Sequence, residues 1–123
     1  AEKAQQIVQS VIDSGQAFNV IYAENDDMAK GAVAALDKAN ISHGVGKDVI
    51  VMGFDCNKWA LEELLNQNWN YDGQCNPYQA SYIEDVIKKL ESGEKIDEKT
   101  IIMDEKGFDA TTITQDDVDQ FGI

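Results

Sequence analysis

Two short apolar runs, FNVIYA at residues 18–23 and VIVMGF at residues 49–54, decide the fold. Both are uncharged and rich in β-branched and aromatic residues, which is typical of strands buried on both faces of a parallel sheet. Between them, Asp26 is placed to cap a helix over residues 27–38, whose small apolar residues suit close packing on a sheet. A strand, a helix and a second strand in this order predict a parallel βαβ unit.

The same alternation continues on both sides of this unit. Further segments with helical or strand-like spacing of apolar residues are helices at 2–14, 57–65 and 77–91 and strands at 69–74 and 100–103. The order predicts an α/β fold with a doubly wound parallel sheet. Because the first element is a helix with no strand before it, we expect an incomplete sheet with a bare edge.

The composition excludes several classes of function. The chain has 123 residues, of which 43% are hydrophobic, and this suits one soluble globular domain. It carries 23 acidic residues against 10 lysines and no arginine, a net charge of −13, which would repel nucleic-acid phosphates and anionic membrane surfaces. No apolar run approaches the roughly 18 to 20 residues that span a bilayer. We therefore expect neither a nucleic-acid partner nor insertion into a membrane.

Three polar side chains stand at the ends of the predicted strands. Asn25 follows the first strand, Asp55 follows the second, and Gln74 ends the third. In open α/β sheets, ligands bind beyond the carboxyl ends of the strands. We therefore expect these three hydrogen-bonding groups to converge on one crevice.

Three stretches carry a family resemblance: YAENDDMAKGAVAAL at residues 22–36, KDVIVMGFDCNKWALEELLNQNW at residues 47–69, and DGQCNPYQASYIEDVIKKLESGEK at residues 72–95. In this order they resemble the periplasmic sugar-binding proteins of the ribose- and galactose-binding type, and the tripeptide Cys75-Asn76-Pro77 is similar to the galactofuranose-binding branch. The resemblance implies the solute-binding component of an ABC importer, which holds a monosaccharide between two lobes and delivers it to a permease. It also implies an extracytoplasmic location, in the periplasm or as a lipoprotein at the cell surface.

An alternative is the sugar-responsive effector-binding domain of a LacI-type transcriptional repressor. That class shares the NDxMAxGA pattern, which begins here at Asn25. The segment DGQCNP, followed by an amphipathic helix, favours transport.

The resemblance also implies how the chain is divided between lobes. Residues 1–74 correspond to part of the second, C-terminal lobe of a type I periplasmic binding protein. Residues 75–104 correspond to a hinge crossing and a helix of the first lobe, and residues 105–123 to the return crossing and the C-terminal tail. The chain therefore looks like the later half of such a protein, and the unpaired sheet edge predicts a homodimer.

In that family, the residues that correspond to Asn25, Asp55 and Gln74 bind sugar hydroxyls. A carboxylate accepts two hydroxyl donors and an amide both donates and accepts, which suits vicinal hydroxyls. Each residue also has a structural interpretation: an Asx turn for Asn25, a helix cap for Asp55 and a backbone hydrogen bond for Gln74.

An enzyme that uses Mg²⁺ is a weaker hypothesis. The carboxylates available to such a metal at the strand ends are Glu24, Asp26, Asp27 and Asp55. No glycine-rich phosphate loop, no arginine and only one histidine accompany them. We predict no catalytic residues, no metal and no cofactor.

The remaining chemistry-bearing residues are interpreted as structural. His43 lies in a polar loop and is expected in solvent, Trp69 is expected in the core, and Trp59 is expected to be half-buried against the sheet. A disulfide between Cys56 and Cys75 is not favoured, because neighbouring strand ends do not guarantee facing Cβ vectors.

Overall fold

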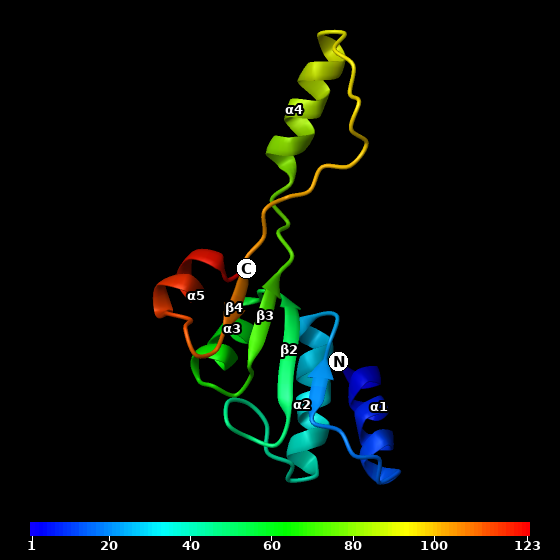
Figure 1. Ribbon diagram of the computed structural model, residues 1–123, viewed down its shortest axis with the longest axis vertical. Coiled ribbons are helices and arrows are strands. Elements are labelled where there is room, and N and C mark those ends of the chain that lie inside the picture. The colour runs from blue at the N-terminus through cyan, green and yellow to red at the C-terminus, as the bar shows by residue number, and fades with distance from the viewer. The chain divides into compact units, whose positions relative to one another are not determined.

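The computed structural model describes residues 1–123, which form two compact units. Unit 1 comprises residues 1–75 and 106–123, and unit 2 comprises residues 76–105. The elements of unit 1 (Figure 1) are α1 (Glu2–Asp13), β1 (Val20–Tyr22), α2 (Asp26–Lys38), β2 (Ile50–Asp55), α3 (Lys58–Leu65), β3 (Tyr71–Gln74), β4 (Gly107–Asp109) and α5 (Gln115–Phe121). Unit 2 contains α4 (Ala80–Glu91). None of these helices is long and apolar enough to cross a membrane.

The strands form one four-stranded sheet in the order β1-β2-β3-β4. β1, β2 and β3 are parallel neighbours, with Tyr22 opposite Met52 and Asp55 opposite Gln74. β4 runs antiparallel to β3. The predicted α/β class and the mostly parallel sheet are confirmed, and β1 lies at an edge of the sheet.

The fourth strand lies where the sequence did not predict one. Residues 100–103 are not a strand, and β4 forms at Gly107–Asp109 instead. Its one apolar residue, Phe108, is buried, with its ring centroid 5.4 Å from that of Phe121 in α5. A three-residue strand with a single apolar side chain is too short to show a periodic pattern in the sequence. β4 is a strand because it pairs with β3.

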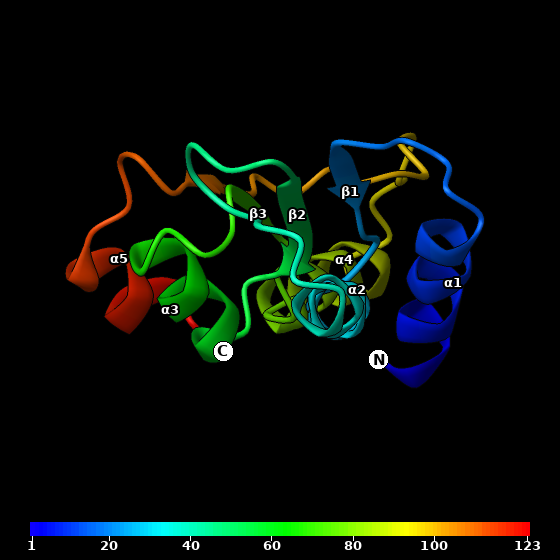
Figure 2. The ribbon, with the colours of Figure 1, turned by 90° about the horizontal axis from the view of Figure 1, so that it is seen from below.

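The helices of unit 1 lie on one face of the sheet (Figure 2). The core beneath that face is built mainly from Ile21, Ala29, Ala32, Leu36, Val49, Val51, Leu61, Leu64, Trp69 and Val118. Trp69 is buried, and Trp59 packs against it edge-to-face with ring centroids 5.8 Å apart. The predictions for both tryptophans are confirmed.

The opposite face of the sheet carries no helix of unit 1 (Figure 2). The predicted burial of residues 18–23 and 49–54 on both faces is therefore wrong, since Val20, Tyr22 and Ile50 are exposed. On this open face the ring of Phe54 lies 5.2 Å from that of Tyr22 and 6.4 Å from that of Tyr71, measured between centroids. An edge strand and a row of exposed or partly buried aromatic rings thus lie together on one side of the sheet.

Unit 2 consists of α4 and the segment that returns beside it. The helix begins at Ala80 rather than at Pro77, because a turn precedes it in which Asn76 Oδ1 accepts a hydrogen bond of 2.8 Å from the Tyr78 backbone N–H. The side chains that line a groove of about 290 Å³ in this unit are mostly apolar: Gln79, Tyr82, Ile83, Val86, Ile87, Ile101 and Met103.

We expect the isolated chain to form a homodimer through the β1 edge and the open face. Val20→Lys places a charge at this edge and should shift the chain from dimer to monomer, because buried lysine on a paired strand is costly. Sedimentation velocity at tens of micromolar measures the shift. Asn66→Lys, at the exposed end of α3, adds the same charge elsewhere and should leave the dimer intact. A wild-type chain that sediments as a folded monomer contradicts this expectation.

Candidate functional site

The three residues predicted from the sequence lie at the carboxyl ends of three neighbouring strands. Asn25 follows β1, Asp55 is the last residue of β2, and Gln74 is the last residue of β3 and the register partner of Asp55. All three side chains are partly buried. The parallel pairing of β1, β2 and β3 therefore brings them to one edge of the sheet, as predicted.

Asp55 begins a strained turn. Its φ is 134° and that of Cys56 is 61°, and L residues rarely adopt either value. The turn sends the chain from β2 into α3, which begins at Lys58. No side chain donates a hydrogen bond to the Asp55 carboxylate. Burial raises the pKa of this carboxyl, the backbone N–H of Asp26 opposes the rise, and the charge of Asp27 adds to it.

Asn25 is the N-cap of α2. Its Oδ1 accepts a hydrogen bond of 2.8 Å from the Met28 backbone N–H. The predicted cap, Asp26, is wrong by one residue, because Asp26 is the first residue of the helix and is fully buried. Asn25 thus fills the structural role that we considered for it, while its Nδ2 has no hydrogen-bond partner in the protein and remains available as a donor.

Gln74 bonds to the chain where it returns from unit 2. Its backbone N–H donates to the Lys106 carbonyl at 2.8 Å, and its Oε1 accepts from the Lys106 N–H at 3.2 Å. The backbone hydrogen bond considered for Gln74 is therefore present. Its Nε2 has no partner in the protein and is a second free donor beside Asp55.

Two buried carboxyl groups lie below this edge, and we did not predict their role. Asp26 Oδ2 accepts from the backbone N–H of Asn57 at 2.8 Å and from its Nδ2 at 3.0 Å. Asp72, in the middle of β3, accepts from the Cys56 backbone N–H at 3.4 Å. Asn57 is the N-cap residue of α3 by position, but its side chain makes no cap bond. The signal in the sequence is an aspartate at a central strand position, where an apolar residue is expected.

These contacts bear on the magnesium hypothesis. Asp26 is inside the protein with one oxygen committed to Asn57, which takes it out of the cluster of strand-end carboxylates that a surface metal would need.

Cys56 is buried and Cys75 is exposed, and both are free thiols. Burial, followed by the nearby charge of Asp72, raises the pKa of the Cys56 thiol.

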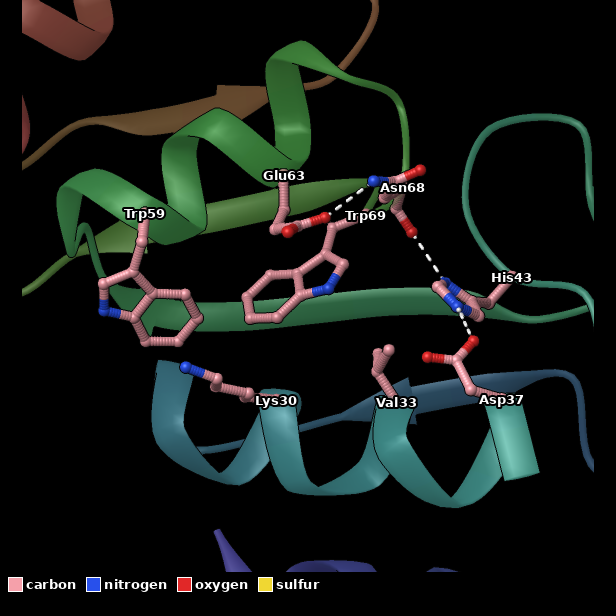
Figure 3. A pocket seen from close by; sticks show the side chains of 8 residues that line it. All are labelled: Lys30, Val33, Asp37, His43, Trp59, Glu63, Asn68 and Trp69. Atoms are coloured by element: carbon pink, nitrogen blue, oxygen red, sulfur yellow. Dashed lines mark hydrogen bonds and ion pairs between the residues drawn. The ribbon is translucent and has the colours of Figure 1, made fainter. Parts of the chain in front are cut away.

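A groove of about 420 Å³ lies between α2 and α3 (Figure 3). The prediction that His43, at the end of this groove, lies in solvent is wrong. Its Nδ1 bonds to the Asn68 carbonyl at 2.8 Å, and its Nε2 bonds to Asp37 at 3.0 Å. Asn68 Nδ2 in turn donates to Glu63 at 2.7 Å. The polar groups of this groove are thus largely paired with one another, which distinguishes it from the strand-end site.

The comparisons with known proteins identify the family. Residues 1–95 match the periplasmic binding protein domain, and because this match spans most of the chain, the chain belongs to that family. The resemblance to ribose- and galactose-type sugar-binding proteins is confirmed. Over 113 residues the chain is 29% identical to the fructose import binding protein FruE of Bifidobacterium longum, a match that covers 90% of this chain and 33% of FruE.

Solved structures agree with this assignment. A Mycobacterium smegmatis protein in complex with β-D-fucofuranose is 27% identical with a TM-score of 0.74, over 88% of this chain and 34% of that one. A galactofuranose binding protein is 21% identical with a TM-score of 0.82, over 98% of this chain and 40% of that one, and it supports the fold alone. The chain spans about a third of the length of FruE. By their names and descriptions, these relatives bind or import sugars.

The strain at Asp55 predicts an unusual order of stability among variants. Asp55→Ala and Asp55→Gly both remove the carboxylate, but Gly accepts a φ of 134° and Ala does not. We expect Asp55→Gly to be more stable than Asp55→Ala by about 1 kcal/mol in urea unfolding at pH 7. The pair Ile50→Ala and Ile50→Gly, at an ordinary position of the same strand, should show the opposite order. The same order at both positions would contradict the strain at Asp55.

Proposed function

We propose that this chain is part of one lobe of the sugar-binding component of an ABC importer, that it acts outside the cytoplasm, and that Asn25, Asp55 and Gln74 bind the hydroxyls of a monosaccharide. The observation that carries the proposal is the set of free polar groups at one sheet edge. Asp55 offers a carboxylate to which no side chain donates, and Asn25 Nδ2 and Gln74 Nε2 offer donors without a protein partner. One acceptor for two hydroxyl donors, flanked by two amide donors, suits vicinal hydroxyls.

The names of the relatives support this function. FruE is a fructose import binding protein, and the Mycobacterium smegmatis structure holds β-D-fucofuranose. These names favour a transport protein over the LacI-type repressor domain. An ABC permease is then the partner to which the sugar is delivered.

We further propose that the two units belong to different lobes, with residues 1–74 in the second lobe, 75–104 in the first, and 105–123 returning to the second. The break between the units after Cys75 and after Glu105 lies within one residue of these boundaries and supports them. The exposed apolar side chains of α4, such as Ile83, Ile87 and Leu90, are suited to packing against the rest of a first lobe.

The test is sugar binding by a two-lobe protein that contains this chain. Asp55→Ala should weaken binding at least a hundredfold, about 2.7 kcal/mol, because a charged acceptor is lost from the closed pocket and sugar donors are left unpaired. Isothermal titration against a panel of furanoses and pyranoses measures the loss. Asp27→Asn, which removes a neighbouring exposed charge, is the matched control and should bind normally. An unchanged affinity of folded Asp55→Ala would refute the site.

The chain by itself should bind monosaccharides only weakly. In this proposal the other wall of the pocket comes from the rest of the first lobe, so few hydrogen bonds form and water is not excluded. We expect dissociation constants of about 1 mM or weaker. A micromolar constant, measured by calorimetry on residues 1–123, would contradict the two-lobe pocket.

A further inference from the structure

Asp26 and Asp72 are the two fully buried charged residues of the chain. Asp26 comes from the first turn of α2 and Asp72 from the centre of β3. Each has one oxygen that accepts hydrogen bonds, and each has one buried oxygen, Asp26 Oδ1 and Asp72 Oδ2, with no donor. Unsatisfied carboxylate oxygens inside a protein are costly, so these two require an explanation.

The space around the orphan oxygen of Asp26 is closed on one side. Gly53 lies against it so tightly that a Cβ at that position would be 2.6 Å from Asp26 Oδ1 and 2.9 Å from the ring of Trp69. A water molecule cannot enter from this side. Among the neighbouring carboxyl groups, Asp72 affects Asp26 most: contact between the two side chains lowers the pKa of Asp26 and raises the pKa of Asp72.

We propose that Asp26 and Asp72 share one proton, with Asp72 as donor and Asp26 as acceptor, and that this acid pair positions the turn that carries Asp55. One O–H···O⁻ bond removes one of the two buried charges and satisfies both orphan oxygens. The outer oxygens of the acid pair then accept the backbone N–H groups of Cys56 and Asn57, the two residues that follow Asp55. Asp26 and Asp72 are therefore positioning residues, and their effect on sugar binding rests on the proposed function.

The charges near the acid pair favour the shared proton. The titratable groups that face it are Asp55 at the end of β2 and Cys56 in the turn, and no lysine lies among them. Burial, then the hydrogen bond and the charge of Asp26, raise the pKa of Asp72 from its ordinary value of 3.8 to about 8. Above that pH, Asp26 and Asp72 would both be ionised in the interior beside the carboxylate of Asp55. Repulsion among these charges would weaken the contacts that position the turn after Asp55.

The sign of the pH dependence follows from this raised pKa. The unfolded chain releases the Asp72 proton near pH 3.8 and the folded chain releases it near pH 8. The stability that Asp72 contributes is thus fully present below about pH 4 and is lost as the pH rises towards 8. Carboxylates with a lowered pKa, such as Asp109, contribute with the opposite sign, so a matched variant is needed.

Asp72→Asn is that variant, because its amide can donate to Asp26 and its carbonyl can accept from the Cys56 N–H without titrating. We expect the Tm of wild type to fall relative to that of Asp72→Asn between pH 4 and pH 8, whereas Asp27→Asn, an exposed control, follows wild type. Carboxyl ¹³C NMR of the wild-type chain reads the proton directly and should show a protonated Asp72 at pH 6. Parallel Tm profiles, or two ionised carboxyls at pH 6, overturn the proposal. A Tm raised by Mg²⁺ in wild type alone also overturns it in favour of a bound cation.

Sugar binding by the two-lobe protein tests the positioning role separately. Wild type should bind sugar about tenfold more weakly at pH 9 than at pH 6. At pH 9 only about a tenth of the molecules keep Asp72 protonated, and only these hold the turn in the binding geometry. Asp72→Asn should keep its pH 6 affinity at both values. Equal loss in both proteins overturns the positioning role. Failure of every protein to bind any sugar refutes the proposed function, while the NMR result still decides the shared proton.

Discussion

The structure depends on two backbone N–H groups that must find acceptors inside the protein. They belong to Cys56 and Asn57, which follow the strained residue Asp55 and donate to the buried carboxyl groups of Asp72 and Asp26. Buried backbone donors are almost always paired, and no strand or helix supplies a partner here. Asp72 and Asp26 do so, and in accepting these bonds they join β2, β3, α2 and the start of α3.

This constraint gives each polar side chain near the strand ends a different role. Capping of α2 is done by Asn25, and the turn is held by Asp26 and Asp72. Asp55 is consequently free of structural hydrogen bonds from side chains, although it stands at the most strained point. Strain that is held in place by neighbouring groups is common at binding sites, because it presents a functional group without further ordering.

The sequence predicted the parts of the structure that depend on local pattern. The α/β order and the strand ends at Asn25, Asp55 and Gln74 follow from apolar runs and their spacing. The role of Asp26 was missed because both Asn and Asp cap helices, and its partner Asn57 lies 31 residues away. His43 was placed in solvent for a similar reason, since the Asn68 carbonyl that it contacts is 25 residues distant. Long-range pairing of polar groups has no periodic signal.

An apolar pair at positions 26 and 72 would avoid two buried carboxyl groups, but it would leave two backbone donors unpaired at a cost of about 1–3 kcal/mol each. Some polar acceptor is therefore required at both positions. Asparagine would meet the same geometric need at position 72 without any charge. What aspartate adds there is a proton that the folded chain holds more tightly than the unfolded one. A buried carboxyl group that is needed only as an acceptor thus links the geometry of the Asp55 turn to pH.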